Sequence, residues 1–375
     1  MTDYLKTKEL YFQLFLQCVL IGFLCNTTVG GQSKEFGAIY QFGDSVSDTG
    51  NIIRIAGPNT ASANLPYGQT FGRPTGRSSD GLLMIDYFAM HFHLPLLNPF
   101  LANGSDFGHG ANFAVAGGTA QDFATLAAQN ITYRLANNAS LASQLGWFNY
   151  HVTSICYSPA ECKEKLRKAL VIVGIIGGND YNLALTQGKT LEEVYQLVPN
   201  VVNTILHAVE EVIQLGAVNV VVPGSHPRGC MPSYLVRFET NDSSKYDDLR
   251  CLKEFNAFSR FHNHKLKRGI KKLKLEYPGV AIAYGDYYSA MTWVLRHAAS
   301  LGFDEDELYT TCCGTGNNNY NYDPSRPCGS LGVSVCSDPN KRVNWDGRHL
   351  TQQAYKYMAS WLLTQFLPAL QEVDA

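Results

Sequence analysis

The chain has 375 residues, of which 45% are hydrophobic and 17% charged, so it can bury the core of one large α/β domain. Its formal net charge is -2 at pH 7, and nucleic acid is excluded as an expected partner because phosphate binding depends on clustered Lys and Arg. The longest basic cluster, residues 265–274, alternates with Leu and Ile and predicts the solvated face of an amphipathic helix.

The amino terminus predicts a secretory signal peptide at residues 1–30. Two lysines precede an apolar stretch, residues 10–25, which two glutamines interrupt. This stretch is too short for a membrane span, which needs about 20 apolar residues, whereas small residues close to position 30 suit signal cleavage. A buried amino-terminal helix is the alternative. We therefore expect a signal peptide and then a single domain at 31–375, in a protein that is secreted to the extracellular space or cell wall, or delivered to the vacuole.

The apolar runs of the chain predict buried parallel strands. They lie at residues 38–42, 111–116, 169–176, 218–222 and 280–284. Helical spacing of apolar residues follows at 198–213, 252–275 and 351–366, and Gly216 supplies a stop for the first of these helices. This alternation predicts a three-layer α/β/α sandwich with a mostly parallel central sheet, in which the carboxyl ends of the strands share one edge. Residues 310–345 lack periodicity and predict a long irregular loop.

The cysteines agree with secretion. Two of the ten lie in the predicted signal, which leaves eight. Eight cysteines allow too many pairings for their connectivity to be deduced, so the hypothesis is limited to local pairs. These are Cys156 with Cys162, Cys230 with Cys251, and two bridges within Cys312, Cys313, Cys328 and Cys336. Zinc is the competing interpretation, but no Cys-x-x-Cys pair occurs, and adjacent cysteines have poor spacing for zinc ligands.

Four Asn-x-Ser/Thr sequons predict glycosylation on the surface. They begin at Asn103, Asn130, Asn138 and Asn241. Each sequon is a weak signal alone, but the four agree with the predicted signal peptide and disulfides.

Three turns that follow predicted strands carry groups suited to acyl transfer. The first ends in Ser45, the second contains Gly117, and the third contains Asn179. In a doubly wound sheet the three turns converge on one crevice. A serine hydroxyl, an unobstructed glycine N–H and an asparagine amide provide a nucleophile and donors to an oxyanion. Each turn alone is equally typical of ordinary structure. Asp48, Gly50 and Asn51, just after the first turn, are interpreted as supports of its geometry rather than as contacts to substrate.

His349 is the candidate base among ten histidines, because Asp346 lies three residues before it, directly ahead of the last predicted helix. This spacing lets the carboxylate accept a hydrogen bond from Nδ1–H and leaves Nε2 to take the proton of the serine. Alternatively, Asp346 caps the helix and His349 is a surface residue. The three turns together favour the catalytic interpretation. The chain contains no Gly-x-Ser-x-Gly motif, which excludes an α/β-hydrolase.

These residues, in this order, resemble the plant Gly-Asp-Ser-Leu (GDSL) esterase/lipase family of the SGNH hydrolase superfamily. Five further segments are similar to patterns of the family: residues 65–68, 72–81, 222–224, 229–230 and 312–314. The resemblance covers nearly all of the chain after the predicted signal. It implies an SGNH hydrolase-like, flavodoxin-like fold and a reaction that needs no metal or organic cofactor.

Carried over by position, the resemblance implies that Ser45 is the nucleophile, that His349 is the general base and that Asp346 orients it. It also implies that Gly117 and Asn179 form the oxyanion hole with the backbone N–H of Ser45.

The chain departs from the family pattern at two positions. Val46 replaces the leucine of the family's name, which leaves the chemistry untouched. Arg348 stands where the family more often has a small apolar residue. This arginine suggests the hypothesis of an acidic or polyol-bearing substrate.

The predicted function is that of a secreted serine esterase or lipase that cleaves a small-molecule carboxylic ester through an acyl-enzyme on Ser45. The closest alternative is an acyltransferase, which would pass the same acyl group, for example hydroxycinnamoyl, to an alcohol. Members of the family do this, and the motifs do not separate the two reactions. A non-catalytic glycan- or lipid-binding protein is a further alternative, against which the intact Ser45, Asp346 and His349 argue. We expect no stable membrane span.

Overall fold

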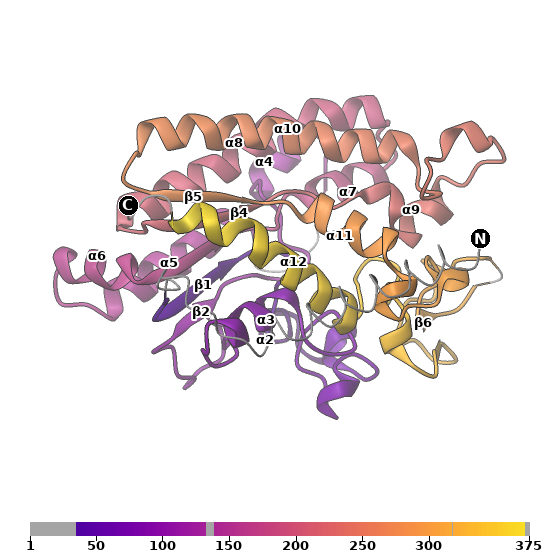
Figure 1. The fold of residues 1–375 in the computed structure, drawn as a ribbon, viewed down its shortest axis with the longest axis horizontal. Helices are drawn as coiled ribbons and strands as arrows, with labels where there is room; N and C mark the ends of the chain where they lie inside the picture. Colours follow the sequence, from indigo (N-terminus) through magenta and orange to yellow (C-terminus); the bar gives the residue numbers. More distant parts are fainter. Residues whose placement is uncertain (1–34, 133–138, 317, 372–375) are drawn as a thin grey trace, which may run out of the picture. The chain divides into compact units, whose positions relative to one another are not determined.

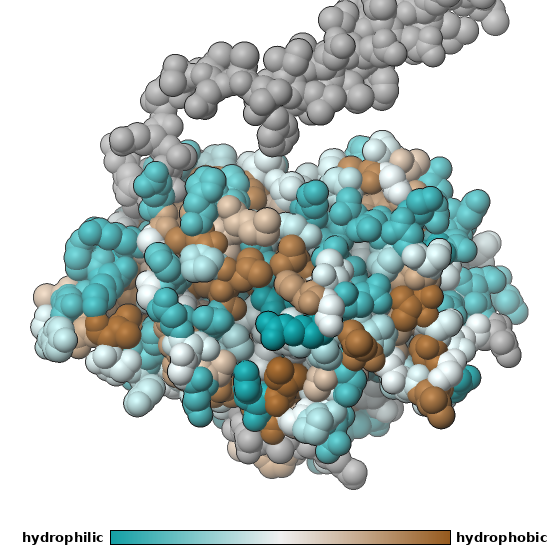
Figure 2. Space-filling model, turned by 90° about the horizontal axis from the view of Figure 1, so that it is seen from below, coloured by the Kyte–Doolittle hydropathy of each residue, from teal (hydrophilic) through white to brown (hydrophobic). Residues whose placement is uncertain are grey.

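The computed structural model describes residues 35–132, 139–316 and 318–371. The predicted signal peptide at 1–30 and the sequon at Asn138 lie outside the described residues. From Phe36 onward the described residues form one compact unit, to which all elements named below belong. Within the described ranges, no helix has both the length and the apolar character needed to cross a membrane. Figure 2 shows that, among the coloured residues of one face, apolar side chains lie in separate groups between hydrophilic ones.

The central sheet has five strands in the order β2-β1-β3-β4-β5, and all neighbouring strands are parallel (Figure 1). The strands are β1 (Ala38–Phe42), β2 (Gly110–Asn112), β3 (Ala169–Val173), β4 (Asn219–Pro223) and β5 (Ala281–Gly285). Almost every strand residue is buried, as expected for a parallel sheet covered on both faces. The predicted parallel α/β architecture is therefore confirmed, with the strand order of flavodoxin-like folds.

Two strands are shorter than predicted, because the chain turns before the apolar run ends. The predicted strand 111–116 ends at Asn112, whose side-chain oxygen accepts a hydrogen bond from the N–H of Ala114 and starts a turn. The predicted strand 169–176 ends at Val173, and Gly174 follows with a φ of 125°. Apolar residues continue past both strand ends because the turns themselves are buried.

Helices cover both faces of the sheet. In chain order they are α2 (Asn51–Ala56), α3 (Met84–His91), α4 (Phe123–Ala128), α5 (Leu141–Ser154), α6 (Pro159–Arg167), α7 (Gly178–Thr186), α8 (Leu191–Leu215), α9 (Pro232–Arg237), α10 (Lys253–Glu276), α11 (Tyr287–Arg296) and α12 (Gln352–Gln371). Helix α8 packs against α10 and β3, and α12 packs against α3, α11 and β5. Figure 1 shows α8 and α10 on one side of the strands and α12 with α3 on the other, which gives the predicted three layers.

The three predicted long helices are present, and local capping sets their ends. Helix α8 begins earlier than the apolar pattern suggested, because Thr190 and Glu193 form a reciprocal capping box at its start. It ends at Leu215, and Gly216 follows as the predicted stop. Helix α12 begins just after Thr351, which accepts a hydrogen bond from the N–H of Ala354, and so lies directly behind the Asp346 to His349 segment.

The disulfides follow the predicted local pairing. Cys156 bonds to Cys162 and Cys230 to Cys251, and the last four cysteines pair as Cys312 with Cys336 and Cys313 with Cys328. The last two bridges begin at the neighbouring residues Cys312 and Cys313 and fasten the irregular segment 312–336. Cys313 begins the short strand β6 (Cys313–Gly314), which pairs with β7 (Ser334–Val335). These cysteines pack with Tyr67 and Trp345 in a small core of their own.

Candidate active site

The turns after β1, β2 and β3 meet at the carboxyl edge of the sheet. The N–H of Asp44 donates to the carbonyl of Ile175 at 3.1 Å, and the N–H of Val115 donates to the carbonyl of Gly43 at 3.1 Å. The turns that contain Ser45, Gly117 and Asn179 are thus joined by backbone hydrogen bonds and line one cavity of about 680 Å³. This is the crevice in which open α/β folds bind their ligands.

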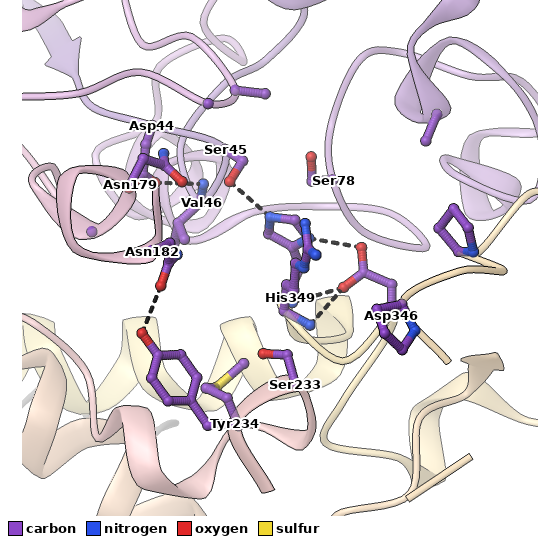
Figure 3. Close-up of a pocket in the computed structure, with 18 of the residues that line it drawn as sticks. Asp44, Ser45, Val46, Ser78, Asn179, Asn182, Ser233, Tyr234, Asp346 and His349 are labelled. Carbon is purple, nitrogen blue, oxygen red and sulfur yellow. Dashed lines mark hydrogen bonds and ion pairs between the residues drawn. The ribbon is translucent and has the colours of Figure 1, made fainter. Parts of the chain in front are cut away.

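His349 lies between Ser45 and Asp346 (Figure 3). Its Nε2 is 2.7 Å from Oγ of Ser45, and its Nδ1 is 2.7 Å from Oδ2 of Asp346. Because the carboxylate accepts a hydrogen bond from Nδ1–H, Nε2 is the nitrogen that can accept a hydrogen bond from the serine hydroxyl. The three residues therefore form one continuous hydrogen-bonded row, although Ser45 and His349 are 304 positions apart in the sequence.

The carboxylate of Asp346 accepts four hydrogen bonds. Oδ1 accepts from the backbone N–H groups of Arg348 at 2.9 Å and His349 at 2.8 Å, and Oδ2 accepts from His349 and from the phenol of Tyr67 at 2.7 Å. Burial acts to raise the pKa of Asp346, but the nearby charge of His349 and these hydrogen bonds lower it to about 2. Asp346 is therefore ionised at neutral and mildly acidic pH and can hold the ring in one orientation.

The turn that carries Ser45 is fixed from two sides. Gln144 accepts a hydrogen bond from the N–H of Gly43 and donates one to its carbonyl, both at 2.9 Å. A side chain at position 43 would place Cβ 3.0 Å from the carbonyl oxygen of Ile175, so the close approach of the next turn requires glycine there. These contacts fix the backbone of the turn that follows β1 and so position Ser45 in the absence of substrate.

Gly117 lies in a segment that two buried carboxylates hold at either end. Asp48 accepts from the N–H of Ala116 at 2.8 Å, and Asp180 accepts from the N–H groups of Ala120 and Gln121, each at 2.9 Å. The backbone of Gly117 has a φ of 82°, in the left-handed region that glycine tolerates. Its position beside Ser45 is therefore set by contacts on both sides.

Asn179 also helps to hold the segment that contains Gly117. Its Nδ2 donates to the carbonyl of Gly118 at 2.9 Å and carries a second hydrogen, and the residue lines the cavity at the start of α7. Burial raises the pKa of Asp180, the next residue, to about 7, although hydrogen bonds from Gln121 and Ala120 and the charge of Arg228 act in the opposite direction.

Asp48 and Asn51 support the turn, which agrees with the interpretation of the sequence. Asp48 accepts hydrogen bonds from the N–H groups of Gly50, Asn51 and Ile52, in addition to that of Ala116. Asn51 donates to the carbonyls of Asn112 and Ala114 at 2.7 and 2.8 Å. They join the segments after β1 and β2.

Three further residues, Tyr67, His226 and Arg228, line the cavity without having been predicted to take part in the site. His226 and Arg228 lie in the segment after β4, at the same edge of the sheet as Ser45. The only feature of the sequence that could have placed these two residues in the site is their position just after a predicted strand. Burial, with the charges of Arg228 and His349, lowers the pKa of His226 to about 3, so its ring is neutral at pH 7. Arg228 is 3% exposed and donates to Tyr234 Oη at 3.2 Å and to Asn182 Oδ1 at 3.3 Å.

The rest of the cavity wall is mostly apolar and comes from distant segments. Among its residues are Leu183 and Leu185 of α7, Val236 of α9, Phe238, and Pro324 and Pro327 of the disulfide-held segment. Figure 3 shows Asn182 and Tyr234 facing each other, joined by a hydrogen bond of 2.6 Å between the phenol and the amide oxygen. Among the described residues, no group of three or more His, Cys, Asp or Glu side chains is arranged to hold a metal ion.

A parallel α/β sheet whose carboxyl edge carries a hydrogen-bonded Ser, His and Asp is the arrangement of a serine hydrolase. The family model described as GDSL-like Lipase/Acylhydrolase matches residues 39–362. The chain therefore belongs to the GDSL-like lipase/acylhydrolase family, and it is a carboxylic ester hydrolase.

Several plant relatives match the chain over most of its length. Acetylajmalan esterase 1 of Rauvolfia serpentina is 43% identical over 354 residues, which cover 93% of this chain and 89% of the relative. A second acetylajmalan esterase of the same plant is 44% identical over 339 residues, covering 90% and 87%. A GDSL esterase/lipase of Arabidopsis thaliana is 42% identical over 351 residues, covering 92% and 86%.

Proposed function

We propose that the protein cleaves a small-molecule carboxylic ester through a covalent acyl-enzyme on Ser45. The observation that supports this most directly is the row from Ser45 through His349 to Asp346, with both side-chain contacts at 2.7 Å, inside a cavity large enough for a small organic ester. Ser45 Oγ attacks the ester carbonyl while Nε2 of His349 takes its proton. Asp346 holds the ring and stabilises the imidazolium that forms.

The negative charge that develops on the carbonyl oxygen requires donors fixed in advance. The backbone N–H groups of Ser45 and Gly117 and the side-chain amide of Asn179 are the proposed donors. The hydrogen bonds that hold Ala116 and Gly118 support this role, because they reduce the reorganisation needed during the reaction. His349 then gives its proton to the leaving alkoxide, and the alcohol departs.

The second half of the reaction releases the acid. Water enters the site of the departed alcohol, His349 takes a proton from it, and the resulting hydroxide attacks the acyl-enzyme. The serine recovers its proton from His349, which restores the starting state. Because three of the relatives are named as acetylajmalan esterases, acetyl esters are the first substrates to test.

The nucleophile is tested with a fluorophosphonate probe and the variant Ser45→Ala. We expect the wild type to be labelled and to hydrolyse an aryl acetate, and the variant to lose both properties. The matched control is Ser360→Ala, on the exposed side of α12, which should behave as the wild type. Labelling of a different serine in the wild type, or hydrolysis by Ser45→Ala, would disprove the proposed mechanism.

The acyl acceptor is tested by product analysis. In buffer, and in buffer with a polyol or sugar acid in excess, we expect the free acid to remain the main product. Accumulation of a new ester would instead identify the protein as an acyltransferase, because both reactions share the acyl-enzyme.

We further propose that the protein is secreted, after removal of residues 1–30. Its four disulfides are compatible with an oxidising compartment, and the three sequons at Asn103, Asn130 and Asn241 are exposed. Expression with a carboxyl-terminal tag in plant cells should yield tagged protein in the medium or wall fraction, with a new amino terminus near residue 31. Endoglycosidase treatment should lower its mass. An intact amino terminus on a protein retained in the cytosol would contradict this proposal.

A further inference from the structure

The charged residues of the cavity wall are unequally distributed. The wall contains three arginines, Arg228, Arg237 and Arg348, and no lysine, but only two acidic residues, Asp44 and Asp346. Among the described residues, none of these three arginines forms an ion pair with a carboxylate. The exposed guanidinium groups of Arg237 and Arg348 are therefore accessible to a bound molecule, whereas the two acidic groups already have partners in the protein.

Both carboxylates of the wall already accept hydrogen bonds from other groups of the protein. Asp346 accepts four hydrogen bonds, as described above. Asp44 is 6% exposed, accepts from the N–H of Val46 at 3.0 Å, and interacts with the charges of His349 and Arg228. A substrate cation would find no unengaged carboxylate in this cavity.

Two of the arginines are exposed and held in place. Arg348 donates through Nε to the phenol of Tyr322 at 3.3 Å, and Arg237 donates through Nη2 to the carbonyl of Leu185 at 2.8 Å. A guanidinium group has five N–H donors in a fixed plane, so one contact leaves several for a ligand. Because these arginines are already positioned, binding a carboxylate with them loses less side-chain freedom.

The inner wall contains one more arginine, Arg228, whose charge interacts with the carboxylates of Asp44 and Asp180. Arg228 lies beneath the cavity surface, and its Nε has no hydrogen-bond partner among the described residues. The neighbouring His226 is half-buried and, being neutral, offers one donor and one acceptor rather than a negative charge. Low-dielectric walls around such groups strengthen their attraction for an anion.

We propose that the ester carries a carboxylate in addition to the reacting ester group, and that Arg348 and Arg237 bind this carboxylate. This inference rests on the proposed esterase function and narrows its substrate class. An acidic ester is favoured over a neutral polyol ester, because a carboxylate offers the exposed guanidinium groups a negative charge that a hydroxyl group does not. It is favoured over a cationic ester, because both acidic residues of the wall are engaged.

The test uses two matched sets of esters that differ in charge. The first places the charge on the alcohol: 4-acetoxybenzoate, its methyl ester, and 4-acetoxyphenyl-trimethylammonium. The second places it on the acyl group: 4-nitrophenyl hemisuccinate, 4-nitrophenyl valerate, and 4-nitrophenyl 4-trimethylammoniobutyrate. Monoacetylglycerol represents the neutral polyol. Each kcat/KM is measured after subtraction of the enzyme-free rate, which removes the attack of the hemisuccinate carboxylate on its own ester. It is then divided by the second-order rate constant of the same ester with hydroxide, which corrects for intrinsic reactivity.

We expect the anionic member of at least one set to exceed its neutral partner by about tenfold, the effect of one hydrogen bond between charged groups. Arg348→Gln and Arg237→Gln should each lower this ratio about threefold or more, and 0.5 M NaCl should lower it in the wild type. Arg268→Gln, which removes the same charge from the exposed face of α10, should leave the ratio unchanged.

An anionic ester that is no better than its neutral partner in both sets would overturn the inference. So would faster turnover of monoacetylglycerol or of a cationic ester, or a ratio unaffected in both pocket variants. Each of these outcomes would overturn only the proposal that the substrate carries a carboxylate. Hydrolysis of the neutral esters would still support the proposed esterase function. If the wild type hydrolyses none of the esters and Ser45 is not labelled by the fluorophosphonate, the proposed function itself fails.

Discussion

The phenol of Tyr67 donates a hydrogen bond of 2.7 Å to Oδ2 of Asp346, 279 positions away in the sequence. The same oxygen contacts Nδ1 of His349 at 2.7 Å. Tyr67 therefore acts behind the carboxylate, holding it in line with the imidazole without contacting Ser45. A structural support of this kind is measurable by its effect on turnover.

Tyr67→Phe should lower kcat by about tenfold, because one hydrogen bond to a charged group is worth about 1.5 kcal/mol. The KM for a small aryl acetate should change less than kcat, since the phenol acts through Asp346. Tyr357→Phe is the matched control, because it removes a hydrogen bond to the carbonyl of Leu301 away from the cavity. A kcat within twofold of the wild type would show that Asp346 needs no support from Tyr67.

Asn179→Ala should lower kcat by roughly 10²- to 10³-fold, with little change in the free energy of unfolding. Loss of one oxyanion donor costs about 2.7 to 4 kcal/mol of transition-state stabilisation. Steady-state kinetics with an aryl acetate and urea denaturation are the measurements. Asn200→Ala, on the exposed side of α8, is the control. If kcat falls only as much as the fraction of folded protein falls, Asn179 has a structural role and is not an oxyanion donor.

Asp180→Asn should impair the reaction through the position of Gly117. Asp180 accepts the N–H groups of Ala120 and Gln121, and an asparagine can accept only through one oxygen. We expect kcat to fall about tenfold and the unfolding free energy to fall by about 1 kcal/mol, the cost of one lost hydrogen bond. Asp180→Glu, which keeps both carboxylate oxygens, should recover part of kcat. Equal kcat in wild type and Asp180→Asn would refute this role.

Removal of the bridge between Cys313 and Cys328 should weaken substrate binding as well as stability. Cys328 lines the cavity, and the bridge closes a loop of 15 residues, for which chain entropy gives about 3 kcal/mol. The double change to serine should therefore lower stability and raise KM. The double serine variant of Cys156 and Cys162, outside the cavity wall, should lower stability without raising KM. An unchanged KM in the first variant would show that the bridge does not shape the cavity.

The pH dependence of stability should reveal the titration of Asp44. Burial raises the pKa of Asp44 to about 6 from 3.8, although the N–H of Val46 and the charges of His349 and Arg228 oppose this. The folded state therefore holds a proton that the unfolded state has lost, so this contribution is present below pH 3.8 and disappears as the pH rises through about 6. Between pH 5 and pH 7 the loss is about 1 kcal/mol.

The measurement is the difference in unfolding free energy between wild type and Asp44→Asn at pH 5 and at pH 7. The difference is required because His226 and His262, whose pKa values are lowered to about 3 mainly by burial, act in the opposite direction over this range. The wild type should lose about 1 kcal/mol relative to Asp44→Asn on going from pH 5 to pH 7. Asp122→Asn is the control, because hydrogen bonds from Thr125 hold the pKa of Asp122 below 3.8. A constant difference would contradict the raised pKa of Asp44.

The sequence by itself determined the features that depend on neighbours along the chain. Buried apolar runs marked the strands, and a turn after each of three strands placed Ser45, Gly117 and Asn179 at one edge of the sheet. The three-residue spacing from Asp346 to His349 is enough for one carboxylate to reach the adjacent ring. The local disulfides, Cys156 with Cys162 and Cys230 with Cys251, followed for the same reason.

Only the tertiary structure decided the contacts between segments that lie far apart in the chain. Tyr67 reaches Asp346, and Asp180 reaches Ala120, because packing of the layers brings their segments together. The spacing of residues along the sequence does not predict such a contact, because the long intervening segment can adopt many conformations. The unequal charge of the cavity is likewise a property of the assembled wall, in which Arg237 ends α9 and Arg348 precedes α12.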